Sequence, residues 1–411
     1  MKSKTIFFFR DNIGFIKNFI YAFSAVILQI GVVQLVILPS ISKTMSSEQY
    51  GLVLTLISIV DIIAITLGAS ICNVRLISIS TYNDECVNGD FNKCCIIYGG
   101  ISVVASMVTS LLYEKEFSGS TVLIGIMAFM AFFFSYSQVA IRLNRKFQYD
   151  IISSLLMAIG YFCGYLIYKL NGQWQFMYIL GYGAGGLFCG VIIGKLYRES
   201  CICTLLFKKT NQQIIELSSS SFIKQLITYA DRLILYPILG GELVAVYYAA
   251  TLIGKMFSIC TNPLNSLLLS YITKPKRGIR NYLMKIIFYS SALCFCVYWL
   301  CLIISKPVLL ILYPQYYEAA LSIIHITLLS AMVEVVISIV TPFTLKIFNT
   351  SLQVLVSIIS TIVYFVSAVI LLEKYSLIGF SIAVLLSSIT KISIFILASL
   401  FNRNEDIVMG D

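Results

Sequence analysis

The sequence predicts an all-α polytopic membrane protein with about twelve transmembrane helices in two six-helix halves. Of its 411 residues, 59% are hydrophobic and 12% are charged, and the mean hydropathy is +0.91. A soluble domain of this length does not need so apolar a composition for its core. Apolar runs of the roughly 20 residues that cross a bilayer also recur along the whole chain.

The first half follows a basic, aromatic amino end, KSKTIFFFRDNIGFIKNF, which we expect at the inner membrane interface. The first apolar run is too long for a cleavable signal peptide and serves as its own insertion signal. In the sixth span Gly186, Gly190 and Gly194 recur at every fourth residue, which predicts close helix packing. The six spans of this half are centred near Val26, Ile62, Val103, Met130, Ile159 and Gly185.

A basic segment, KLYRESCICTLLFKKTNQQ, separates the two halves. We assign residues 1–197 to the amino-terminal half, 198–213 to a cytoplasmic connector and 214–411 to the carboxy-terminal half. Setting EQYGLVLTLISIVD over ELVAVYYAATLIGK aligns Asp61 with Lys255 without a gap, which indicates an internal repeat of the kind found in transporters. The spans of the second half are centred near Thr228, Ile259, Cys296, Leu329, Val363 and Leu386.

Topology explains the formal net charge of +10 without a nucleic-acid partner, for which the chain has no motif. An even number of spans puts both termini on one side of the membrane. The excess of Lys and Arg on that side identifies it as the cytoplasm. The expected outer loops carry few basic residues, namely Lys43, Lys115, Lys169, Lys306 and Lys374.

The loops between the expected spans are too short to hold a catalytic domain, so we do not expect an enzyme. The 12 Cys lack the spacing and the His partners of a zinc site. His325, the one histidine of the chain, is expected to be buried in the tenth span and alone. The sequence therefore predicts neither a metal nor a cofactor.

The stretch 218–255, SSSSFIKQLITYADRLILYPILGGELVAVYYAATLIGK, places Lys224, Asp231, Arg232 and Lys255 in otherwise apolar sequence. An ionisable group at bilayer depth costs several kcal/mol, so such groups usually face a polar cavity. Lys224 and Asp231 share one helical face, whereas Arg232 points about 100° away. Either Lys224 and Asp231 neutralise each other within the fold, or they face a water-filled cavity between the halves.

Other charged residues lie within spans and extend this candidate site. Basic residues outnumber acidic ones, so the cavity would suit a phosphate-bearing ligand. The acidic residues are candidates for coupling to H⁺ or Na⁺, and nothing in the sequence selects among them. The basic candidates are Lys224, Arg232, Lys255 and Lys391. The acidic candidates are Asp61, Asp231 and Glu334.

Three segments carry a family resemblance that extends over essentially the whole chain. They are EQYGLVLTLISIVD after the first span, ITYADRLILYPILGGELVAVYYAA at spans seven and eight, and LLILYPQYYEAALSIIHITLL before span ten. Together they resemble the polysaccharide-transporter branch of the MOP flippase superfamily, and within it an O-antigen flippase of the Wzx type. Asp231 and Arg232 match acidic and basic positions at the start of the family's seventh span. Matches at structural positions in turns are Tyr50, Gly51, Tyr316 and Ala319.

The resemblance implies a MOP/MATE-like fold and a bacterial inner-membrane protein of lipopolysaccharide biosynthesis. Such a protein moves an undecaprenyl-diphosphate-linked O-antigen oligosaccharide between leaflets by alternating access, without covalent chemistry. Its expected partners are this lipid-linked oligosaccharide and membrane lipid, together with an O-antigen polymerase and a chain-length regulator.

Two other functions compete with this prediction. A MATE-like ion-coupled exporter of organic cations would need an excess of acidic residues in its cavity, whereas basic residues are in excess here. A membrane-embedded O-antigen polymerase or ligase would carry a large outer loop with catalytic residues, whereas the expected outer loops are short. We therefore favour the flippase.

Overall fold

The computed structural model describes residues 20–21, 23–85, 89–144, 146–199, 203–271, 279–347 and 350–401. Nearly all of these residues are helical. They form two compact units, Met1–Gly241 and Glu242–Asp411. The amino-terminal segment that we expect at the membrane interface lies outside the described residues.

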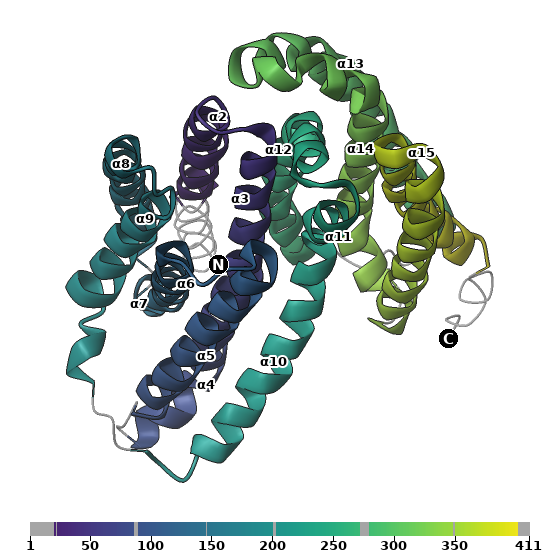
Figure 1. The fold of residues 1–411 in the computed structure, drawn as a ribbon. Helices are drawn as coiled ribbons and strands as arrows, with labels where there is room; N and C mark the ends of the chain where they lie inside the picture. Colours follow the sequence, from purple (N-terminus) through teal and green to yellow (C-terminus); the bar gives the residue numbers. More distant parts are fainter. Residues whose placement is uncertain are drawn as a thin grey trace, which may run out of the picture. The chain divides into compact units, whose positions relative to one another are not determined.

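The amino-terminal unit is a helical bundle in which α3, α4, α5 and α6 pack together and α8 pairs with α9 (Figure 1). Its elements are η1 (Val32–Ile37), α2 (Leu38–Ser42), α3 (Ser47–Val60), η2 (Asp61–Ile65), α4 (Thr66–Glu85), α5 (Gly89–Glu114), α6 (Gly119–Ser137), α7 (Val139–Leu143), α8 (Gln148–Asn171), α9 (Gln175–Leu187), η3 (Phe188–Ile193), η4 (Leu196–Arg198), α10 (Phe207–Thr228) and α11 (Ala230–Leu239).

The second span is one long apolar helix with a local change of winding. It starts at α3, where the Ser46 hydroxyl caps the helix by accepting a hydrogen bond from the backbone N–H of Gln49 (3.3 Å). It continues through the π-helical turn η2, which begins at Asp61, and then into α4. Such π-turns inside α-helices frequently occur at functional sites.

Glycines allow the close helix packing that the sequence predicts. A Cβ added at Gly190 would lie 2.7 Å from the ring of Phe133, and one at Gly194 would lie 2.7 Å from the Cβ of Ala140. Gly186 likewise approaches Phe133, at 2.9 Å. The interpretation of this glycine series as a packing ridge is therefore confirmed.

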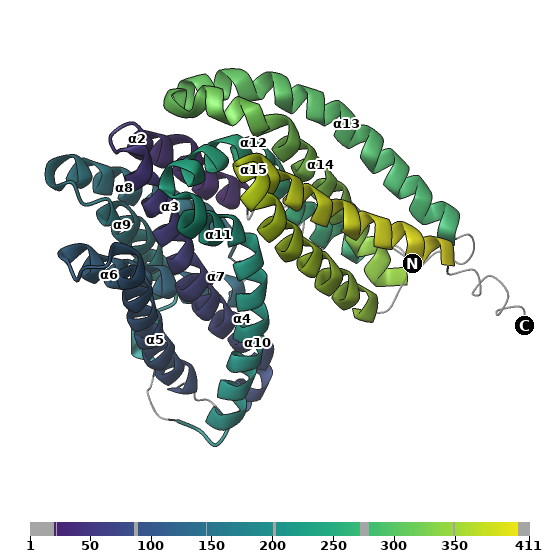
Figure 2. The same cartoon turned by 45° about the vertical axis from the view of Figure 1, so that its right-hand side comes forward.

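The carboxy-terminal unit contains three long helical elements, α13, α14 and α15, that pack against one another (Figure 2). The last of them consists of two helices that meet at Ser376, where φ is 50° and ψ is −131°. The Ser387 hydroxyl donates a hydrogen bond to the carbonyl of Ser360 (2.9 Å), so the two arms form a hairpin. The elements are α12 (Gly241–Tyr271), α13 (Ile279–Leu312), η5 (Pro314–Tyr316), α14 (Tyr317–Ile347) and α15 (Thr350–Phe401).

Within the described residues, nine helical segments are long and apolar enough to cross a membrane. The last of these, Leu352–Leu400, contains two of the expected spans because of the turn at Ser376. The predicted all-α polytopic fold is confirmed. The helix α10, which we divided between the connector and the second half, and the helix α11, which we assigned to the second half, belong to the first compact unit. The proposed domain boundaries remain a prediction.

Candidate functional site

The expected seventh span, which is not among the nine candidate membrane helices, is a broken helix. The helix α10 ends at Thr228, Tyr229 leaves the helical conformation with φ −103° and ψ 8°, and α11 begins at Ala230. The carboxylate of Asp231 accepts a hydrogen bond from the backbone N–H of Arg232 (2.9 Å), in the first turn of α11 where negative charge is favourable. Discontinuous helices of this kind commonly form the binding sites of membrane transporters.

Asp61 faces this break. Its Oδ1 accepts a hydrogen bond from the Tyr182 hydroxyl and its Oδ2 accepts one from the Tyr229 hydroxyl, both at 3.2 Å. The guanidinium of Arg232 attracts the same carboxylate electrostatically. The carboxylate therefore has two phenol donors and one cation around it, supplied by α9 and by the broken seventh span.

Arg232 is buried and anchored on α3. Its Nη1 donates to the Ser58 hydroxyl (2.6 Å) and to the carbonyl of Leu54 (3.4 Å). Its guanidinium also lies 5.5 Å from the centre of the Tyr229 ring. A guanidinium keeps its charge at any physiological pH, so this site holds fixed positive charge inside an apolar bundle. We call Ser58, Asp61, Tyr182, Tyr229 and Arg232 the polar centre.

The structure brings together three of the residues that the sequence singles out, Asp61, Asp231 and Arg232. Lys224 lies on the exposed side of α10, whereas Asp231 is buried. The sequence analysis missed Ser58 and Tyr182. The sequence does contain a pattern that could have identified Tyr182. The aromatic residues Trp174, Tyr178 and Tyr182 recur at every fourth position and so share a helical face.

The predicted residues of the carboxy-terminal unit lie in two places. The Nζ of Lys391 on α15 forms an ion pair with the Oε1 of Glu334 on α14 (2.7 Å), and the Ser388 hydroxyl donates to the same oxygen (2.8 Å). Lys255 on α12 is half-buried, with its ammonium 5.9 Å from the centre of the Tyr247 ring.

The expectation for His325 was wrong. This residue is exposed on α14, and its Nδ1 lies 3.1 Å from the hydroxyl of Tyr298 on α13. We expected it to be buried because it stands in an apolar sequence, but the direction of a side chain depends on how its helix packs.

A second polar network anchors the predicted connector to α4 and α5. The buried Asp90 carboxylate accepts hydrogen bonds from the Tyr82 hydroxyl (2.6 Å), the backbone N–H of Thr204 (2.8 Å) and the Thr204 hydroxyl (2.6 Å). Burial and the neighbouring carboxylate raise the pKa of Tyr82 to about 12. Nearby, Arg75 forms an ion pair with Glu199.

Comparison with known proteins identifies the fold. No protein-family model and no curated protein matches the chain. The structure is similar to the lipid II flippase MurJ in an inward closed conformation, with a TM-score of 0.64, 13% identity, and coverage of 94% of this chain and 86% of that one. The chain has the fold of the MOP-superfamily transporters. A MATE-family transporter of that superfamily, inward-facing, matches with a TM-score of 0.61, 15% identity, and coverage of 92% of this chain and 94% of that one.

An outward-facing MATE structure matches the same MOP fold, with a TM-score of 0.60, 12% identity, and coverage of 93% of this chain and 95% of that one. These neighbours are named as flippases and transporters, not enzymes. At such low identity the likeness establishes the architecture, and the cargo has to be argued from the residues of this chain.

Proposed function

We propose that the protein is a flippase that moves an undecaprenyl-diphosphate-linked O-antigen oligosaccharide across the bacterial inner membrane by alternating access. The observation that carries this proposal is the buried, permanently charged Arg232 beside the break in the seventh span, within a fold shared with a lipid II flippase. A fixed cation next to a broken helix suits an anionic diphosphate.

In this mechanism the diphosphate is neutralised by basic side chains while the prenyl chain stays in lipid. Arg232, Lys224 and Lys255 are the proposed contacts. Lys391 is the fourth, and its ion pair with Glu334 must open before it can bind the diphosphate. The exchange replaces the carboxylate by a phosphate oxygen as the partner of the ammonium, and Glu334 then keeps the hydrogen bond from the Ser388 hydroxyl.

Ion coupling is assigned to the acidic residues of the same regions. Asp61, Asp231 and Glu334 are the candidates for H⁺ or Na⁺. Asp61 is the best placed of them, because its carboxylate adjoins both the charge of Arg232 and the phenol of Tyr229 at the helix break. A change in its charge would alter both contacts, which links ion binding to the geometry of the seventh span.

The remaining assignments follow from the same proposal. We place both termini in the cytoplasm, as the distribution of Lys and Arg predicts. The six-helix halves 1–197 and 214–411 would alternate about the substrate, joined by the connector 198–213. An O-antigen polymerase and a chain-length regulator would act on the delivered oligosaccharide.

Reconstituted vesicles test the proposal. They would contain an undecaprenyl-diphosphate oligosaccharide, and the rate at which its glycan becomes accessible to a membrane-impermeant lectin would be measured. We expect the wild-type protein to accelerate exposure, Arg232→Ala to abolish the acceleration, and Lys306→Ala, which removes an exposed lysine of α13, to leave it unchanged. No acceleration by a folded wild-type protein would overturn the proposal.

One observation favours a second candidate, a MATE-like ion-coupled exporter. The MATE neighbours share the fold over nearly the whole chain, and the polar centre contains an acidic residue. An imposed pH or Na⁺ gradient that drives a fluorescent organic cation out of the same vesicles, with no exposure of glycan, would select this function.

A further inference from the structure

A cavity of about 520 Å³ opens in the amino-terminal unit between two helical turns. The turn that joins α2 to α3 contributes Thr44 and Met45, and the first turn of α3 contributes Gln49. The last turn of α8 contributes Lys169, and the turn that joins α8 to α9 contributes Trp174. The distribution of basic residues predicts that both turns lie on the outer side of the membrane. The cavity is separate from the polar centre.

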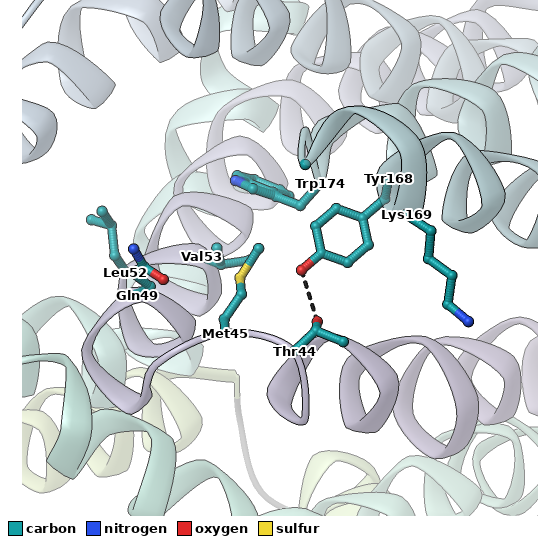
Figure 3. Close-up of a pocket in the computed structure, with 9 residues that line it drawn as sticks. Thr44, Met45, Gln49, Leu52, Val53, Tyr168, Lys169 and Trp174 are labelled. Atoms are coloured by element: carbon teal, nitrogen blue, oxygen red, sulfur yellow. Dashed lines mark hydrogen bonds between the residues drawn. The ribbon is translucent and has the colours of Figure 1, made fainter.

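The walls of the cavity are held in place. The hydroxyls of Thr44 and Tyr168 are hydrogen-bonded at 2.7 Å and so link the turn between α2 and α3 to the end of α8, as Figure 3 shows. Gly172 ends α8 with φ 72°, a conformation that favours glycine, and lets the chain reverse at once into α9. Trp174 is 6% exposed and packs edge-on against Tyr178, with ring centres 6.1 Å apart.

The lining combines aromatic rings with groups that form hydrogen bonds. Trp174 and Tyr168 supply rings, Gln49 supplies an amide and Thr44 supplies a hydroxyl. Lys169 also lines the cavity, and its ammonium lies over the Tyr165 ring, 5.0 Å from the ring centre. A pyranose ring has an apolar C–H face, which packs on an aromatic ring, and a rim of hydroxyls, which bind amide, hydroxyl and ammonium groups. The volume falls within the roughly 300–1,000 Å³ usual for small-molecule sites.

The same lining argues against other ligands. No Asp or Glu is among the residues that line the cavity, and Lys169 would repel an organic cation. A lipid chain would form no hydrogen bond with the Gln49 amide. We propose that this cavity binds one or two pyranose units of a glycan, and that the exposed Lys169 ammonium moves from the Tyr165 ring to pair with an acidic sugar. The inference rests on the proposed function, because it treats the transported glycan as the ligand that reaches this face.

Intrinsic fluorescence of the full chain gives a direct test. The sequence has 2 tryptophans, so Trp299→Phe on α13 leaves Trp174 as the sole reporter. The purified variant would be titrated with glucose, galactose, rhamnose, N-acetylglucosamine and glucuronate. We expect a saturable change in Trp174 emission with at least one sugar, and about tenfold weaker binding after Gln49→Ala or, for glucuronate, Lys169→Ala.

Trp174→Phe, which keeps the exposed Trp299, serves as the matched control and should give no saturable change. Calorimetric titration of the unmodified protein with the same sugars checks the result without any substitution. No saturable binding of any of these sugars by either method, or binding that survives Gln49→Ala and Lys169→Ala together, would overturn the inference. Glycan exposure in vesicles is measured separately, so a protein that flips its substrate but binds no free sugar refutes this site and leaves the proposed function intact.

Discussion

A double-mutant cycle on Asp61 and Arg232 tests whether the polar centre acts as a unit. Arg232→Met keeps the bulk of the side chain and removes its hydrogen bonds to Ser58 and Leu54. The Ser58 hydroxyl keeps its own bond to the carbonyl of Leu54 (2.7 Å), so the substitution leaves no unpaired hydroxyl there. Asp61 would keep its two phenol donors and lose the nearby cation.

The structure sets the expected magnitude. A hydrogen bond from a charged donor contributes about 1.5–3 kcal/mol, and the 3.4 Å bond to Leu54 is the weaker of the two. Loss of the coulombic attraction between Arg232 and Asp61 adds to this cost. Asp61→Asn removes the negative charge, so this attraction to Arg232 is already lost in that variant. Arg232→Met should therefore cost less in the double mutant, with a coupling energy of about 1–3 kcal/mol.

The assay is unfolding of each variant by sodium dodecyl sulfate titrated into mixed micelles, with the free energy of unfolding compared at one pH. Lys306→Met, which replaces an exposed lysine, controls for the loss of a positive charge. Single effects that add to within about 0.5 kcal/mol would show that the two residues act independently and would refute the reasoning.

Three further predictions concern other parts of the chain. A Cβ at Gly51 would lie 1.9 Å from a backbone oxygen, so Gly51→Ala should lower the midpoint of thermal unfolding sharply. Gly100→Ala is the control: its added Cβ would have no atom within 4 Å, so the midpoint should stay unchanged or rise slightly. The phenol of Tyr82 ionises near pH 10 in the unfolded chain and near pH 12 in the folded one, so the free energy of unfolding should fall between these pH values. In alkaline unfolding curves Tyr82→Phe should make this fall shallower, and an unchanged dependence on pH would contradict the assignment. Glu334→Gln leaves the half-buried Lys391 without its carboxylate and should lower the free energy of unfolding by about 1 kcal/mol at neutral pH. High salt should shrink this difference from the wild type, and a difference that salt does not change would point away from an ion pair.

Composition and the length of apolar runs determined the all-α polytopic fold, because crossing a bilayer requires about 20 apolar residues and satisfies the backbone within each helix. The same local information predicted the packing of Gly186, Gly190 and Gly194, since the spacing of small residues decides how closely helices approach. It also singled out Asp61 and Arg232, because a charge inside an apolar run can be recognised without knowing its neighbours.

Only the tertiary structure decided which polar and charged side chains contact one another. Tyr182 reaches Asp61 from a helix far along the chain, and Lys391 pairs with Glu334 across two helices. The interruption at Tyr229 was likewise invisible in the apolar pattern, which runs on through it. Hydropathy reports only how each residue partitions between water and lipid. The partner of a buried polar group depends on the rotation and depth of neighbouring helices, which are set by the packing of the whole bundle.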